Sequence, residues 1–63
     1  NALDRLQPMV HNYLTEGHAW QKHGITARQV LERNQVIAEG SETLWRFARR
    51  LVESAVEKGY LAP

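Results

Sequence analysis

The residues of this sequence best suited to bind a metal ion are three histidines, His11, His18 and His23. Imidazole nitrogens are common metal ligands, but a compact site needs closely spaced ligands supported by further carboxylates or thiolates. The histidines are separated by seven and five residues, and the chain contains no cysteine. We therefore interpret them as solvated or turn residues, and we expect neither a metal nor another cofactor.

Motifs for covalent or phosphate chemistry are also missing from the sequence. It contains no Gly-x-Ser-x-Gly elbow, no phosphate-binding loop and no Gly-x-Gly-x-x-Gly turn. Asp4 and Glu16 do not pair by spacing, and a few short helices leave little room for a substrate cavity. These observations predict a chain that is not an enzyme and that has no catalytic residues.

Arginines give the strongest chemical signal. At about 100° per residue, Arg46, Arg49 and Arg50 fall on the side of a helix opposite the apolar stripe that contains Leu44 and Leu51. Arginine offers a planar fork to guanine or to phosphate, and a recognition helix enters the major groove with its N-terminal turns. The pattern favours a domain that binds double-stranded DNA through the N-terminal half of this helix.

Three helices are expected to position these residues. In the first, apolar residues recur at helical intervals: Leu3, Leu6, Val10, Tyr13 and Leu14. Asn1 is a candidate cap, but Pro8 interrupts the pattern, so we predict a lead-in turn over 1–7 and a helix from Pro8 to about Glu16. Residues 18–24 show no period and are predicted to be a connection.

The second and third helices have clearer boundaries. Thr26 and Gln29 form a capping-box pattern, and the helix that follows ends near Ala38 or breaks near Asn34. Ser41 is the expected N-cap of a long helix over 42–58, which Gly59 should end. Tyr60 and Leu61 could add at most a vestigial strand, so the predicted fold is mainly all-α, a three-helix bundle of helix-turn-helix type.

Part of the sequence resembles the winged-helix family of DNA-binding domains. Thr26–Arg33 is similar to its second helix, Gly40–Val52 to its turn and recognition helix, and Glu57–Leu61 to the Glu-Lys-Gly-apolar ending that leads into the wing. The resemblance covers residues 25–61. It departs from the family in a longer segment before the recognition helix, and the chain ends at Pro63 before a hairpin wing.

The resemblance and the arginine pattern together imply a set of DNA contacts on three elements. Some would come from the third helix and its cap, and others from the neighbouring elements, where they would bind phosphate. The predicted contacts are Ser41, Thr43, Arg46, Arg49, Arg50, Arg28 and Lys22.

Each of these signals also has a plainer interpretation. In the first alternative the arginines form only a solvated face, in which Glu42 and Glu53 pair with them at three- and four-residue spacings. An apolar flank of the third helix could be core, or it could be a seam for a homodimer or for other domains of a parent protein. The residues of this alternative interface are Trp45, Val52 and Val56, with Trp20 as a further anchor.

Composition limits the class of protein. Sixty-three residues allow one helical domain over 1–63, and the net charge of +1 excludes coating of nucleic acid by bulk charge. No apolar run reaches the ~18 residues that a membrane span requires. The first residue is Asn1 rather than Met, so we expect a fragment of a larger bacterial-type regulatory protein. The lack of cysteine favours a cytoplasmic location.

Overall fold

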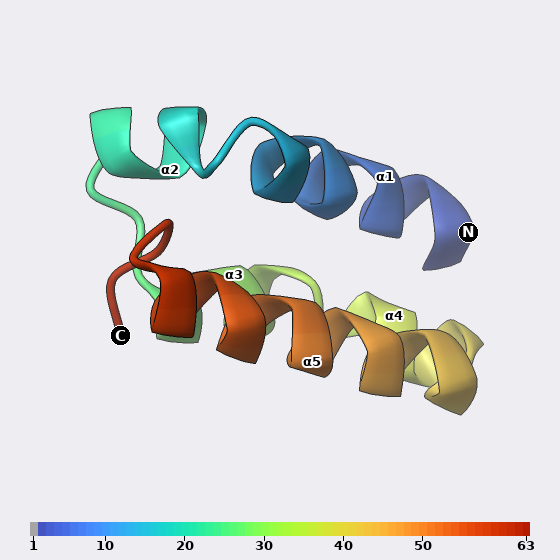
Figure 1. Ribbon diagram of the computed structural model, residues 1–63. Coiled ribbons are helices and arrows are strands. Elements are labelled where there is room, and N and C mark those ends of the chain that lie inside the picture. The colour runs from blue at the N-terminus through green and yellow to red at the C-terminus, as the bar shows by residue number, and fades with distance from the viewer. Residues whose placement is uncertain (1) are drawn as a thin grey trace.

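The computed structural model describes residues 2–63, which form helices joined by short turns (Figure 1). Within this range there is no strand, and a single isolated parallel bridge joins Thr26 to Ala62. The prediction of a mainly all-α bundle is confirmed. The helices of the described range are α1 (Ala2–Leu14), α2 (His18–Lys22), α3 (Ala27–Arg33), α4 (Val36–Gly40) and α5 (Glu42–Lys58).

The first helix begins earlier than predicted, because α1 runs through Pro8. An interior proline costs about 3 kcal/mol, whereas burying a leucine side chain contributes about 1.5–3 kcal/mol. Leu6 is buried and Ala2 packs against the core, so tertiary packing offsets the missing backbone hydrogen bond. The predicted lead-in turn over 1–7 is therefore wrong for the described residues, and the proposed cap Asn1 lies outside them.

The segment predicted to be a connection contains a helix, α2, whose five residues are too few to show a period. Its stability comes from Trp20, which is buried in the core while its neighbours in α2 are exposed. Short helices of this kind depend on tertiary packing rather than on helix propensity.

The caps predicted at Thr26, Ser41 and Gly59 are confirmed. Thr26 Oγ1 accepts a hydrogen bond from the Gln29 amide at 3.2 Å, and Gln29 Oε1 accepts one from the Thr26 amide at 3.0 Å. Ser41 Oγ accepts a hydrogen bond from the Leu44 amide at 3.2 Å, and α5 runs from Glu42 to Lys58 as predicted.

The break near Asn34, which the sequence left open, separates α3 from α4. The Asn34 side chain donates a hydrogen bond to the Val30 carbonyl at 2.8 Å, a local bond that ends α3.

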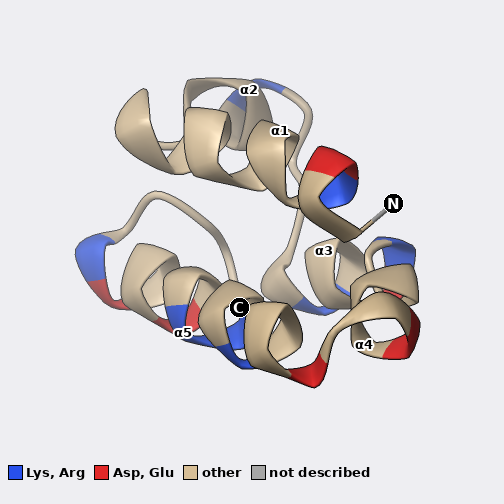
Figure 2. Ribbon diagram, turned by 90° about the vertical axis from the view of Figure 1, so that its right-hand side faces the viewer, with Lys and Arg blue, Asp and Glu red and all other residues tan. Residues whose placement is uncertain are grey.

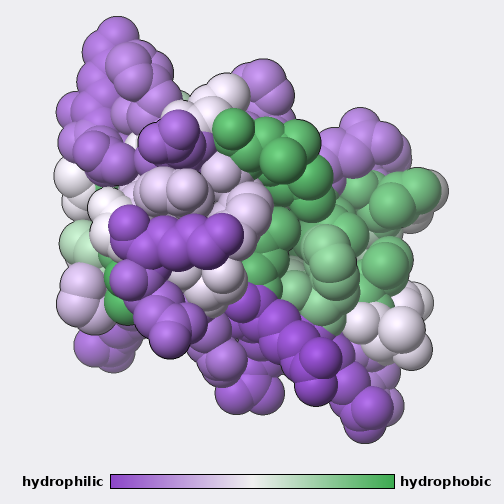
Figure 3. Space-filling model, in the orientation of Figure 1, coloured by the Kyte–Doolittle hydropathy of each residue, from purple (hydrophilic) through white to green (hydrophobic). Residues whose placement is uncertain are grey.

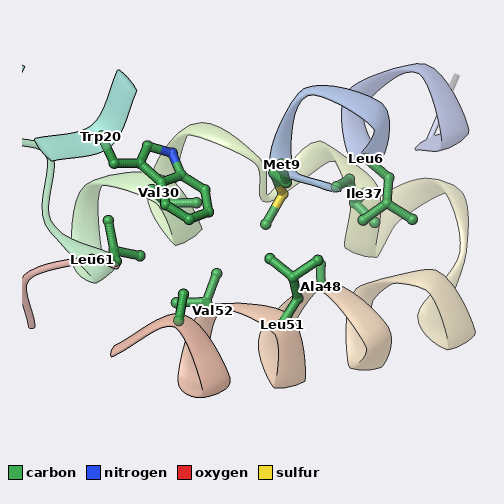
Figure 4. Close-up of a cluster of buried hydrophobic side chains, with 10 residues drawn as sticks. Leu6, Met9, Trp20, Val30, Ile37, Ala48, Leu51, Val52 and Leu61 are labelled. Atoms are coloured by element: carbon green, nitrogen blue, oxygen red, sulfur yellow. The ribbon is translucent and has the colours of Figure 1, made fainter. Parts of the chain in front are cut away.

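The core lies between α1 and α2 on one side and the three later helices on the other. α1 packs against α4 and α5, and α3 and α4 both pack against α5. Side chains from every helix meet between these layers (Figure 4). The buried hydrophobic residues are Leu6, Met9, Trp20, Val30, Ile37, Ala48, Leu51, Val52, Ala55 and Leu61. No helix within residues 2–63 is long and apolar enough to cross a membrane.

Two left-handed residues, Glu16 and Gly17, turn the chain from α1 into α2. The Gly17 amide donates to the Asn12 carbonyl at 2.7 Å, and the Glu16 amide donates to the Tyr13 carbonyl at 3.0 Å, the bonds of a Schellman motif. Gly17 has φ 72°, and a Cβ atom at this position would overlap the backbone carbonyl of Tyr60. Only glycine therefore fits here.

We predict that Gly17→Ala lowers the free energy of unfolding by about 3 kcal/mol, because left-handed strain adds to a clash with backbone that cannot move freely. Gly24→Ala is the matched control, since Gly24 also has a positive φ of 62° but has no atom within 4 Å of the added methyl group. It should cost about 1 kcal/mol. Urea unfolding followed by circular dichroism measures both values, and equal losses would contradict the close approach of Gly17 to Tyr60.

Candidate functional site

The three arginines predicted to contact DNA lie together on the outer side of α5. Arg46, Arg49 and Arg50 line a shallow groove of about 220 Å³, and Glu53 completes its wall. Arg46 Nη2 is 3.1 Å from Glu42 Oε1, so this guanidinium is already paired within the helix. Acidic and basic residues are interspersed along α5 (Figure 2). The groove is mixed in charge rather than uniformly basic.

The other predicted DNA contacts are spread over separate elements and are partly occupied. The Ser41 hydroxyl caps α5, and Thr43 is exposed in the first turn of that helix. Arg28 Nε is 3.1 Å from Glu32 Oε1 on α3, while Lys22 is exposed in the last turn of α2. Exposed ion pairs of this type contribute little to stability.

The residues of the alternative interface divide between core and surface. Trp20 and Val52 are buried among the chain's own side chains, so neither is available to a partner. Trp45 and Val56 are half-buried and also pack against the core. These four side chains therefore do not form a continuous exposed interface on the described part of the chain.

A polar cluster that spacing could not reveal joins the C-terminal ends of α1 and α5. The Tyr13 hydroxyl and Ser54 Oγ are 2.8 Å apart, although 41 positions separate the two residues. Lys58 Nζ lies 5.2 Å from the centroid of the Tyr13 ring and 6.0 Å from that of Tyr60. The two rings pack edge to face with centroids 5.7 Å apart.

This cluster stabilises the ionised form of the Tyr13 side chain relative to a tyrosine in water. The hydrogen bond from Lys58 lowers the pKa of Tyr13, the hydrogen bond with Ser54 adds to this effect, and Tyr13 in turn raises the pKa of Lys58. The hydrogen bond between Tyr13 on α1 and Ser54 on α5 joins the two helices, so the cluster holds α1 against α5. A tyrosine with a lowered pKa can also transfer protons.

An apolar stripe on α1 consists of Leu3 and Leu14, which are exposed, and of Val10 between them, which is half-buried and also packs against the core. Leu3 is 52% exposed and Leu14 is 73% exposed. Together with Leu6, these residues line a groove of about 260 Å³ whose polar members are Gln7 and His11. Figure 3 shows hydrophobic surface along α1 on this side of the molecule. The helical intervals grouped Leu3, Leu6, Val10, Tyr13 and Leu14, but the structure buries only Leu6 of these five residues fully.

Comparison with known proteins gives one informative match. No family model and no curated protein matches the sequence. The crystal structure of a predicted metal-dependent phosphohydrolase from Magnetospirillum magnetotacticum MS-1 matches the whole chain with 51% sequence identity and a TM-score of 0.92. The match covers 33% of that protein's chain, so the present chain spans about a third of its length.

This match overturns two predictions. A neighbour with 51% identity is named as a phosphohydrolase and not as a DNA-binding protein, so the prediction of a DNA-binding domain is wrong. The expectation that the chain has no enzymatic role is wrong for the same reason. Arginines on an exposed helix face arise in proteins with no nucleic-acid ligand, and here Glu42 and Glu53 accompany them. The match does not support the alternative of a dimerisation domain either.

The described residues do not provide a site for the metal that the neighbour's name implies. Nowhere in residues 2–63 do three histidine, cysteine or acidic side chains come close enough together to hold an ion. His18 is the first residue of the short helix α2 and His23 follows its last residue, whereas His11 lies on α1.

We predict that removing the Lys58 ammonium raises the pKa of Tyr13, because the phenolate loses its main stabilising partner. Lys58→Met, made in a Tyr60→Phe background so that Tyr13 is the remaining tyrosine, should shift the phenolate absorbance transition to higher pH. Arg49→Met in the same background is the matched control, since it removes a cation from the opposite side of α5. An equal shift in both variants would mean that net charge rather than the local contact sets the pKa.

Proposed function

We propose that this chain is a helical region of a metal-dependent phosphohydrolase. The observation that carries the proposal is the match to such a protein over all 63 residues. An identity of 51% corresponds to about 32 positions, whereas ten hydrophobic side chains form the buried core. Shared folding alone requires mainly that the core keep its pattern and volume. An identity of this extent over the whole chain supports common ancestry of the two proteins as well as a shared fold.

In this proposal the metal ligands come from parts of a longer protein outside residues 2–63. The support is that no three histidine, cysteine or acidic side chains converge within the described range. Catalytic metals in hydrolases need several protein ligands and an open position for water or substrate. The helices would then provide packing and rigidity for a neighbouring catalytic region rather than ligands. The substrate class would be phosphate esters.

We further propose that the protein works in the cytoplasm. The lack of cysteine supports a reducing compartment, where structural disulfides do not form.

The full-length protein should hydrolyse phosphate esters only when metal is bound. We expect stoichiometric divalent metal by elemental analysis and turnover of p-nitrophenyl phosphate or its diester. Chelation should lower the rate by at least about 100-fold, because a metal contributes several kcal/mol to such reactions, and adding metal back should restore it. A full-length protein without metal and without turnover of either ester would refute the proposed function.

A second experiment tests whether the metal ligands lie elsewhere. We expect the triple variant His11→Asn, His18→Asn and His23→Asn to keep the metal content of the full-length protein, because these side chains do not converge. Arg5→Asn, Gln21→Asn and Lys22→Asn together form a control with as many surface changes on α1 and α2. Loss of metal in the histidine variant alone would show that this region supplies ligands after all.

A further inference from the structure

The apolar stripe on α1 is exposed to a degree that the packing of the chain does not explain. Leu14 and Leu3 are more than half exposed, while Leu6 on the same helix is buried. The three residues of the stripe recur at seven- and four-residue intervals, so they face one direction. Exposed apolar side chains that line one groove are a feature of surfaces that contact other chains or segments.

Apolar surface continues from the stripe towards α5. Phe47 is 51% exposed and precedes Ser54 by seven residues, which is two helical turns. Ser54 contacts Tyr13 on α1, so Phe47 lies on the flank of α5 that is turned towards α1. In Figure 3 hydrophobic surface extends from α1 down towards α5.

The chemistry of the groove restricts what can cover it. Its lining contains no lysine, arginine, aspartate or glutamate, and its polar side chains are Gln7 and His11. A charged ligand or a nucleic acid would find no ionic partner there. An apolar helix or sheet face would bury Leu3 and Leu14 without burying an unpaired charged group.

The size of the stripe argues against a dimer of this chain. A contact along the 13 residues of α1 is about 20 Å long and about 10 Å wide, roughly 200 Å² on each side. Stable dimers bury about 800 Å² per partner. A segment of the same polypeptide is already held nearby at an effective concentration of about millimolar, so a smaller apolar contact is sufficient.

We infer that the stripe of Leu3, Val10 and Leu14 is the surface on which the remaining part of a longer phosphohydrolase chain packs. The inference rests on the proposed function, because the matched phosphohydrolase has two thirds of its chain outside the region equivalent to these residues. The occupant is an apolar helix or sheet face of that remaining part.

Cysteine labelling tests this packing, because the 63 residues contain no cysteine of their own. Leu14→Cys places a thiol in the stripe, and Arg5→Cys places one on the opposite side of α1, where Arg5 is exposed. In the native full-length protein, maleimide should label position 14 at least about tenfold more slowly than position 5. Mass spectrometry of the peptides carrying each position measures the two rates. In the 63-residue chain alone, the two rates should be similar.

The outcomes separate this inference from the proposed function, because labelling does not depend on catalysis. Protection of position 14 in a full-length protein without hydrolase activity would support packing by the rest of the chain and reject the phosphohydrolase assignment. Equal labelling of positions 14 and 5 in an active full-length protein would overturn the inference alone. Protection already present in the 63-residue chain and lost on dilution would also overturn it, since a second copy would then be the occupant.

Discussion

The structure depends on the contacts made by the short segment that follows α5. The Tyr60 carbonyl lies directly against Gly17, and the Tyr60 ring packs on Tyr13 at the end of α1. Leu61 is buried in the core, and the Ala62 carbonyl accepts a hydrogen bond from the Ala27 amide at 2.6 Å. This segment therefore contacts the end of α1, the turn into α2 and the start of α3. A chain of this size buries only a small core, so each of these contacts is a substantial part of what holds the layers together.

The elements that local signals determine could be predicted from the sequence. The helix α5 and the caps at Thr26 and Ser41 depend on residues within one turn of each other, and they appear where expected. The start of α1 and the existence of α2 could not be predicted, because both depend on burial of Leu6 and Trp20 against distant parts of the chain. The propensity cost of Pro8 is visible in the sequence, whereas the tertiary packing that outweighs it is not.

The candidate surfaces also divide into features that local sequence signals predict and features that depend on tertiary packing. Helical periodicity correctly placed Arg46, Arg49 and Arg50 on the exposed side of α5. Exposure alone does not reveal a ligand, however, and the inference of DNA binding from it was wrong. The bond between Tyr13 and Ser54 spans 41 positions and has no counterpart in spacing. Periodicity also could not show that α1 is buried along Leu6 and Met9 but open along Leu3 and Leu14, since all four are apolar.

The contacts of Tyr60, Leu61 and Ala62 have a consequence for how the polypeptide acquires its shape during translation. The ribosome produces α1, α2 and α3 well before these residues, yet all three elements depend on them for hydrogen bonds or burial. The helices that emerge first therefore lack these contacts until the segment after α5 has been synthesised. Their apolar side chains stay accessible to chaperones over that interval, and folding should then proceed in one late cooperative step.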